Sequence, residues 1–143
     1  MRLFLDTSVL LAACGSAKGA WREIFRLALY NPWTLIATPY VLEEVNRNLP
    51  VLPTSAESDW LALRSQLVLR DDVVTLHQIA IYPVTKDRPI LFSALAWADV
   101  LLTLDRKDFA GLLGNEFYGL SILTPGTFLE RERALGRLLL QDS

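Results

Sequence analysis

Short apolar segments alternate in this chain with longer segments whose apolar residues recur at helical spacing. The short segments are Arg2–Asp6, Thr34–Thr38, Asp72–Leu76, Val100–Leu104 and Ser121–Thr124. An apolar run of this length, bounded by polar residues, is typical of a buried strand in a parallel sheet. Strands that alternate with helices place those helices on both faces of the sheet. The sequence therefore predicts one α/β domain over residues 1–143, a three-layer α/β/α sandwich with a central, mostly parallel sheet of about five strands.

The segments between the predicted strands are expected to form helices. These are Lys18–Tyr30, a helix that begins at Pro39, a helix that runs through Trp60 to Val68, residues 85–98, Phe109–Leu113, and Pro125–Leu140. Thr38 is expected to cap the Pro39 helix, because a threonine hydroxyl can accept a hydrogen bond from a free N–H of the first turn. The last helix carries an apolar stripe made of Phe128, Leu129, Leu135, Leu138 and Leu139. That stripe either closes the core or docks a partner.

The composition predicts an apolar interface and excludes a disulfide, a Cys/His zinc site and a membrane span. Hydrophobic residues make up 52% of the sequence, which predicts an apolar interface such as that of a homodimer. The chain has one cysteine, Cys14, and one histidine, His77, which are too few for an internal disulfide or a Cys/His zinc site. No apolar run approaches the ~20 residues of a membrane span and no basic leader opens the chain. We therefore expect a cytoplasmic protein with no membrane partner.

Acidic residues gather at the boundaries of the predicted strands and helices. They are Asp6 after the first strand, Glu43 and Glu44 in the helix after the second, Asp87 at the start of the helix before the fourth, and Asp105 and Asp108 after the fourth. In an open α/β sheet, ligands bind at the carboxyl ends of the strands, where these acids are expected to meet. Like charges raise one another's pKa, so such a cluster is stable mainly when a divalent cation neutralises it. Mg²⁺ and Mn²⁺ accept oxygen ligands of this kind.

Each acid taken alone has a structural explanation. Asp6 could cap the helix that follows it, and Asp87 could cap the helix before the fourth strand. Asp105 and Asp108 could be turn residues, and one of Glu43 and Glu44 is expected on a solvated helix face. Single structural roles do not explain why all these acids fall at element boundaries on one edge. Their joint occurrence favours a metal site.

Four motifs, in order and in spacing, resemble one family. They are Leu3-Phe-Leu-Asp-Thr-Ser8, Thr38-Pro-Tyr-Val-Leu-Glu-Glu-Val45, Lys86-Asp-Arg-Pro-Ile-Leu91 and Leu102-Thr-Leu-Asp-Arg-Lys-Asp-Phe109. Over nearly its whole length the chain resembles a PIN-domain nuclease of the VapC toxin type. The resemblance implies a PIN-like fold and a ribonuclease that depends on Mg²⁺ or Mn²⁺, cleaves single-stranded RNA, and is the toxin of a toxin–antitoxin pair with a small antitoxin protein as partner.

The resemblance also assigns roles to individual residues. The acidic metal-binding quartet would be Asp6, Glu44, Asp87 and Asp105, with Asp108 as a fifth member or as a substitute for Asp105. Glu44 is preferred to Glu43 because the family's glutamate usually precedes an aliphatic residue, here Val45. From the second layer around the metal, Thr7 or Ser8, and Thr103, would orient the carboxylates. The candidates for phosphate contacts are Lys86, Arg88, Arg106 and Lys107, which could equally be ordinary solvated charges.

Two other functions compete with the ribonuclease. One is a PIN-fold module that binds RNA or protein without cutting, although such a module has no need for the full set of acids. The other is an aspartyl-phosphate phosphatase or receiver, which would also use an aspartate at a strand end. That class expects a second aspartate two residues on or a lysine at a strand end, and Asp6-Thr7-Ser8 offers neither.

Overall fold

A computed structural model describes residues 1–73, 88–106, 109 and 111–140, and these residues contain one six-stranded sheet. Its strands are β1 (Arg2–Leu5), β2 (Thr34–Ala37), β3 (Leu67–Leu69), β4 (Val100–Leu102), β5 (Glu116–Phe117) and β6 (Leu120–Leu123). The strand order is β3-β2-β1-β4-β6-β5, and every neighbouring pair is parallel except β5 with β6. The predicted mostly parallel sheet is therefore confirmed, with one strand more than expected.

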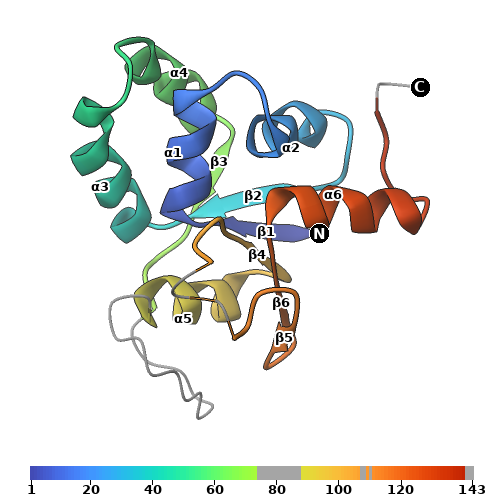
Figure 1. Ribbon diagram of the computed structural model, residues 1–143. Helices are drawn as coiled ribbons and strands as arrows, with labels where there is room; N and C mark the ends of the chain where they lie inside the picture. The colour runs from blue at the N-terminus through green and yellow to red at the C-terminus, as the bar shows by residue number, and fades with distance from the viewer. Residues whose placement is uncertain (74–87, 107–108, 110, 141–143) are drawn as a thin grey trace.

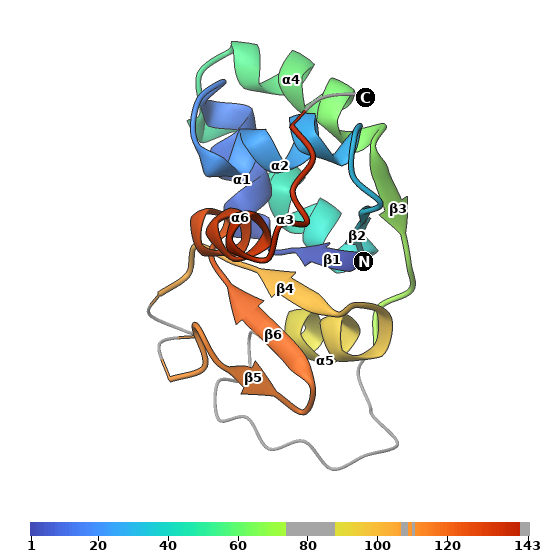
Figure 2. The ribbon, with the colours of Figure 1, turned by 90° about the vertical axis from the view of Figure 1, so that its right-hand side faces the viewer.

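Helices cover both faces of this sheet. They are α1 (Thr7–Gly15), α2 (Ala20–Ala28), α3 (Pro39–Asn48), α4 (Ser55–Arg64), α5 (Arg88–Trp97) and α6 (Pro125–Ala134), with a 3₁₀ turn, η1 (Leu49–Val51), between α3 and α4. Figures 1 and 2 show α5 on one face of the sheet and α1, α2 and α6 on the other. The predicted three-layer α/β/α arrangement is confirmed. None of the helices in the described ranges combines the length and the apolar character that a membrane span requires.

Burial of apolar side chains holds the three layers together. Leu3, Phe4 and Leu5 of β1 are fully buried, as is Leu101 of the neighbouring strand β4. Their side chains alternate between the two faces, so β1 contributes to the core on both sides of the sheet. Removing such side chains from water stabilises the fold by about 1.5–3 kcal/mol each. The centre of the sheet is consequently a rigid base for whatever lies at its edge.

The strand order changes direction at β1. From β1 the chain passes to β2 and β3 on one side, and it later returns to β4 and β6 on the other side. Open α/β sheets bind ligands at such a switch point, outside the carboxyl ends of the two central strands. Asp6 directly follows β1 and Thr103 directly follows β4, so the topology places these two residues at the switch point.

The third strand lies earlier in the chain than predicted. The helix that contains Trp60 ends at Arg64, and Leu67–Leu69 form β3 instead of extending that helix. The predicted strand Asp72–Leu76 is wrong for residues 72 and 73, which have no regular structure, and residues 74–76 lie outside the described ranges. Leu67 and Val68 continue the helical spacing of α4, but hydrogen bonding to β2 makes them a strand. Such a pairing is not visible in local periodicity.

The predicted helix Phe109–Leu113 and the end of the last helix also differ from the structure. The described residues of 109–113 form turns, and the chain then enters β5, a short antiparallel strand that was not predicted. Tyr118 (φ 50°) and Gly119 (φ 85°) join β5 to β6, and two positive φ angles are what a two-residue hairpin turn requires.

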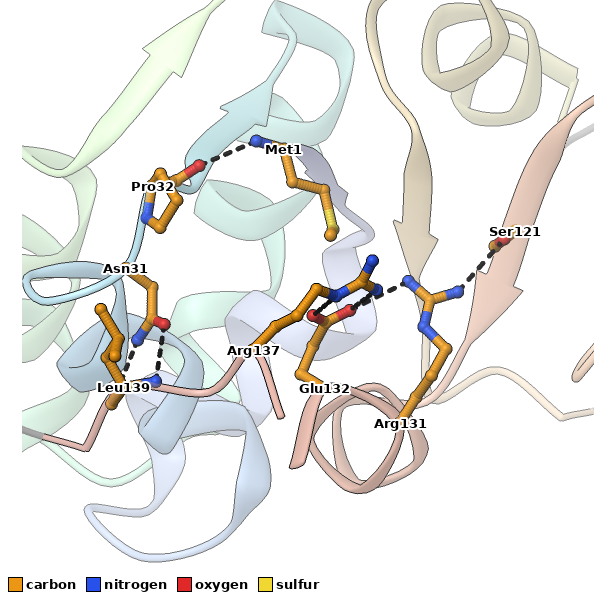
Figure 3. Close-up of polar contacts among 8 residues, drawn as sticks. All are labelled: Met1, Asn31, Pro32, Ser121, Arg131, Glu132, Arg137 and Leu139. Atoms are coloured by element: carbon orange, nitrogen blue, oxygen red, sulfur yellow. Dashed lines mark hydrogen bonds and ion pairs between the residues drawn. The ribbon is translucent and has the colours of Figure 1, made fainter. Parts of the chain in front are cut away.

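The last helix, predicted to reach Leu140, ends at Ala134. Gly136 has a φ of 70°, its N–H donates to the carbonyl of Arg133, and the N–H of Arg137 donates to that of Glu132. This pair of bonds is the Schellman motif that commonly ends helices. Beyond it the chain is held by Asn31, whose side chain bonds both the N–H and the carbonyl of Leu139 (Figure 3).

Candidate functional site

Asp6 is a nearly buried carboxylate at the carboxyl end of β1, with 5% of its surface exposed. Its Oδ1 accepts a hydrogen bond from the backbone N–H of Thr7 at 2.8 Å. Its Oδ2 accepts two, from Ser8 Oγ at 2.8 Å and from Thr103 Oγ1 at 2.7 Å. Asp6 is also the N-cap of α1. Asp6 is therefore both a helix cap and a residue at the sheet edge, the two roles that the sequence suggested.

The two hydroxyls that bind Asp6 are themselves fixed by the backbone after β4. Ser8 Oγ accepts from the N–H of Leu104 at 3.0 Å, and Thr103 Oγ1 accepts from the N–H of Asp105 at 3.0 Å. Each hydroxyl oxygen accepts its backbone bond through a lone pair, so the hydroxyl proton is left to be donated to Asp6. Ser8 and Thr103 thus tie Asp6 across the switch point to the chain that leads into Asp105.

Glu44 is linked to Asp6 through Thr7. Thr7 Oγ1 donates to Glu44 Oε1 at 2.9 Å, while the N–H of the same residue binds Asp6. The neighbouring Glu43 is exposed and pairs with Arg47 at 2.8 Å, one helical turn further along α3. Glu44 therefore faces the edge where Asp6 lies, whereas Glu43 lies on the solvated face of the helix.

Within the described ranges, no basic side chain balances the charge of Asp6. Burial raises the pKa of the Asp6 carboxyl above its ordinary value, and the charge of Glu44 raises it further. The hydrogen bonds from Thr103, Ser8 and Thr7 act in the opposite direction and favour the ionised form. No lysine or arginine among the described residues contacts Asp6. A buried carboxylate next to a second acid is the environment that a divalent cation stabilises.

Of the remaining predicted acids and bases, the structure describes Asp105 and Arg106. Asp105 is half-buried, and its N–H joins the Thr103 hydroxyl. Arg106 is exposed in the turn that follows. Outside the described ranges lie Asp87, Asp108, Lys86, Lys107 and the side chain of Arg88. Within the part of the chain that the structure describes, no three acidic, histidine or cysteine side chains form a group that could hold a metal. Of the predicted acids that the structure describes, Asp6 and Glu44 are linked to each other, through Thr7.

Asp72 is a residue near the site that the sequence did not single out. Its Oδ2 accepts a hydrogen bond from the N–H of Tyr40 at 3.1 Å, in the first turn of the helix that carries Glu44. Thr38, the predicted cap of this helix, makes no capping bond with its side chain, and its buried hydroxyl has no partner. Thr38 therefore occupies the predicted N-cap position, but its hydroxyl does not bond to the first turn. No local pattern identifies Asp72, which lies 32 residues from the N–H that it caps.

A cavity of about 320 Å³ lies between α3 and α4, away from these acids. Its lining is formed by Asn46, Leu49, Pro50, Glu57, Trp60, Leu61 and Arg64. None of the predicted catalytic residues lines it. Leu61 in this lining is 69% exposed, and Val51, which follows Pro50 in the chain, is 83% exposed. This surface is a candidate for contact with another chain, separate from the carboxyl edge of the sheet.

The fold is similar to a solved structure of a toxin–antitoxin system. A chain of VapBC2 from Rickettsia felis, solved with a DNA fragment from its promoter, superposes with a TM-score of 0.60. The match covers 85% of this chain and 97% of the other, at 17% sequence identity. The chain has a PIN-like, VapC-type fold. The fold that the four sequence motifs implied is therefore confirmed.

A second similar structure is the VapC20 toxin of Mycobacterium tuberculosis, which is described as cleaving the sarcin–ricin loop. It superposes with a TM-score of 0.41 over 76% of this chain and 94% of the other, at 21% identity. No protein-family model and no curated protein matches the chain. At these identities the VapC-type likeness concerns the fold, and the chemistry has to be argued from the residues of this chain.

Proposed function

We propose that this VapC-type protein is a metal-dependent endoribonuclease that hydrolyses phosphodiester bonds of single-stranded RNA. The observation that carries the proposal is the environment of Asp6. This carboxylate is buried at the switch point of the sheet, accepts three hydrogen bonds, has a second acid beside it, and contacts no basic side chain among the described residues. A charge in that position is costly unless a cation joins it.

The residues at this edge fit Mg²⁺ or Mn²⁺. Asp6 and Glu44 offer carboxylate oxygens, which such hard cations prefer. Asp87, Asp105 and Asp108 remain the further predicted ligands. When bound, a divalent cation supplies a Lewis acid that lowers the pKa of water and stabilises charge on the leaving oxygen. We infer that the chain's own contribution is to hold the carboxylates in a fixed arrangement.

Ser8 and Thr103 are the proposed positioning residues for Asp6. Both hydroxyls donate to Oδ2, which leaves Oδ1 with only the Thr7 N–H. The free electron pair for a cation is therefore on Oδ1, the oxygen next to the residue that also binds Glu44. For the RNA, we propose phosphate contacts from Arg106 and from Lys86, Arg88 and Lys107, the cations that flank the acids in sequence.

Three variants test the enzyme proposal. Asp6→Asn keeps the shape of the side chain and removes its charge, so RNA cleavage with Mn²⁺ should fall by at least about 100-fold, beyond the loss typical of an outer-shell partner. Glu44→Gln should also reduce cleavage strongly, and Glu43→Gln on the solvated face should not. The measurement is the cleavage rate of a labelled single-stranded RNA at saturating Mn²⁺. Wild-type rates for Asp6→Asn would refute the proposal.

We further propose that the protein is the toxin of a toxin–antitoxin pair and binds a small antitoxin protein. The fold similarity to the VapBC2 chain and the exposed apolar surface around the α3–α4 cavity support this partner. Co-purification of the product of a neighbouring reading frame would test it. Charged substitutions at the exposed Leu61 should weaken that complex, whereas the same substitution at the exposed Leu29 of the α2 end should leave it intact.

A homodimer is the second proposed assembly. Large apolar side chains are exposed at Leu135, Leu139 and Leu140 in the C-terminal region. A stable dimer of ordinary kind buries about 1,600 Å² in total. Sedimentation velocity at micromolar concentration should therefore show a dimer, and a protein that remains monomeric at about 100 µM would contradict the proposal.

A further inference from the structure

Residues 70–73 connect three elements of the fold within four consecutive positions. The N–H of Arg70 donates to the carbonyl of Ala37 at the end of β2. Trp97 Nε1 of α5 donates to the carbonyl of Asp71 at 2.9 Å, and the N–H of Val73 donates to Ser93 Oγ of α5 at 2.9 Å. Between these two bonds to α5, the Asp72 side chain binds the start of α3. We call residues 70–73 the brace.

The bond between Asp72 and Tyr40 supplies what α3 lacks locally. The first turn of a helix has N–H groups with no partner inside the helix, and Pro39 at the first position removes one of them. Thr38 does not cap the turn, so the Asp72 carboxylate takes the place of a local cap. A negative charge at this end of a helix is also favoured by the helix dipole. The start of α3 is thus fixed by a residue that belongs to the brace and not to the helix.

The placement of α3 determines where Glu44 lies. Glu44 follows Tyr40 by about one turn of the helix, and its side chain reaches Thr7 Oγ1, which is fixed beside Asp6. Ser93, which holds the brace, is fully buried in α5. The brace therefore fixes the start of α3 relative to α5.

We propose that Asp72 is a positioning residue for Glu44: anchored on α5 through the brace, it fixes the first turn of α3 so that the Glu44 carboxylate stays beside Asp6. The proposal deepens the function proposed above, because it rests on Glu44 being a ligand of the divalent cation. The competing explanation is that Asp72 is an ordinary helix cap that contributes stability and nothing more.

Comparison with another capped helix separates the two explanations. In α6, Thr124 Oγ1 accepts from the N–H of Thr127 at 3.2 Å, and no proposed ligand lies on that helix. Asp72→Ala and Thr124→Ala each remove a cap, and both should lower the melting temperature. Only Asp72→Ala should weaken Mn²⁺ binding measured by calorimetry without RNA. We expect the dissociation constant to rise roughly 3- to 10-fold, at or below the low end of the range for outer-shell partners.

Two further variants test whether Asp72 acts through Glu44. Asp72→Asn keeps an oxygen acceptor and should restore most of the wild-type affinity, since asparagine caps helices about as well as aspartate. In a Glu44→Gln background, Asp72→Ala should have no additional effect on Mn²⁺ affinity, because the residue through which it acts is already altered. An unchanged dissociation constant in Asp72→Ala, or a full additional effect in the Glu44→Gln background, would overturn the proposal.

A measurement without metal keeps this test separate from the proposed function. In metal-free protein, Asp72→Ala should accelerate hydrogen exchange of the Tyr40 amide and shift the ¹³C resonance of the Glu44 carboxyl, whereas Thr124→Ala should do neither. If wild type binds no Mn²⁺ but these changes occur, the metal function fails and the link from Asp72 to Glu44 stands. If Mn²⁺ binds and the Glu44 resonance does not respond to Asp72→Ala, the link itself is wrong.

Discussion

Two acids of this protein are buried in different parts of the fold, and they are stabilised in different ways. Glu132, in the last turn of α6, is 1% exposed and accepts two bonds of 2.8 Å from Arg137, with Arg131 at 3.4 Å (Figure 3). Asp6, at the carboxyl edge, is 5% exposed and contacts two hydroxyls and a backbone N–H. Each oxygen of both carboxylates accepts at least one hydrogen bond. Among the residues that the structure describes, arginines balance the charge of Glu132 and no basic side chain balances that of Asp6.

This difference indicates what each acid is for. A buried carboxylate with a paired guanidinium needs nothing from outside the chain, and the pair holds the segment after α6 in place. A buried carboxylate whose donors within the described ranges are all neutral, with Glu44 nearby, retains a negative charge that an external cation can neutralise. The contrast separates a structural ion pair from a candidate metal ligand without reference to any other protein. Four predictions test it.

The largest effect is expected from metal added to the folded protein. Mn²⁺ at 100 times its dissociation constant should stabilise the wild type by about 2.7 kcal/mol, which raises the melting temperature by roughly 5–10 °C for a chain of this size. Asp6→Asn should abolish that increase, because it removes the charge that the cation meets. Glu132→Gln should retain it, since Glu132 is paired with Arg131 and Arg137 and is not a proposed ligand. Calorimetric melting with and without Mn²⁺ measures both, and an equal increase in all three proteins would remove the distinction.

The second effect concerns the metal-free protein, where the two acids should respond with opposite sign. Glu132→Gln loses charge-assisted hydrogen bonds in a buried position, and the free energy of unfolding should fall by about 1.5–3 kcal/mol. Asp6→Asn removes a desolvated charge that has no cation, so its stability should equal or exceed that of the wild type. Urea unfolding in the presence of a chelator compares them. A large destabilisation by Asp6→Asn would show that its charge is already balanced inside the fold.

The sequence predicted the central part of this architecture because the relevant signals are local. Short apolar runs identified β1, β2 and β4 nearly to the residue, and the strand ends identified Asp6 and Glu44 as residues of one edge. The choice of Glu44 over Glu43 came from the family resemblance and agrees with the side on which the structure places it, but its role as a ligand stays a prediction. The resemblance also named Thr7, Ser8 and Thr103, which donate to Asp6 in the structure, whereas the burial of Asp6 is a result of packing that no motif contains.

The elements that the sequence did not predict depend on contacts between distant residues. Leu67 and Val68 become a strand only because β2 is available for pairing, and β5 exists only as the partner of β6. Asp72 accepts a hydrogen bond from the N–H of Tyr40, which lies 32 residues earlier in the chain. The end of α6 is a different case, because Gly136 is a local stop signal and the apolar spacing of the following leucines obscured it.

The third prediction sharpens the contrast through the hydroxyls of the Asp6 edge. Thr103→Val keeps the shape of the side chain but removes a donor to Asp6 Oδ2 and an acceptor for the N–H of Asp105. Mn²⁺ affinity should fall by about 10-fold, and Thr103→Ser should restore most of it. Thr127→Val, which removes a hydroxyl bonded to Thr124 near the start of α6, is the control and should leave the affinity unchanged. Titration calorimetry gives the three constants, and equal losses in both valine variants would contradict the role of Thr103.

The smallest effect is the pH dependence of the metal-free protein. Burial, opposed by three hydrogen bonds, raises the pKa of Asp6 above its value in the unfolded chain, so between those two pKa values the folded state binds more protons than the unfolded state. The free energy of unfolding of the wild type therefore decreases as the pH rises through this interval, and above the folded pKa the full destabilisation by the buried charge is present.

Asp6→Asn lacks this dependence. The stability advantage of Asp6→Asn over the wild type should accordingly be largest near neutral pH and should shrink in acid, whereas Glu132→Gln should remain less stable than the wild type near neutral pH. Urea unfolding of the three proteins across the acid range measures these differences. An advantage of Asp6→Asn that grew as the pH fell would mean that the folded protein holds the Asp6 charge more favourably than water does, and the carboxyl edge would then need no cation.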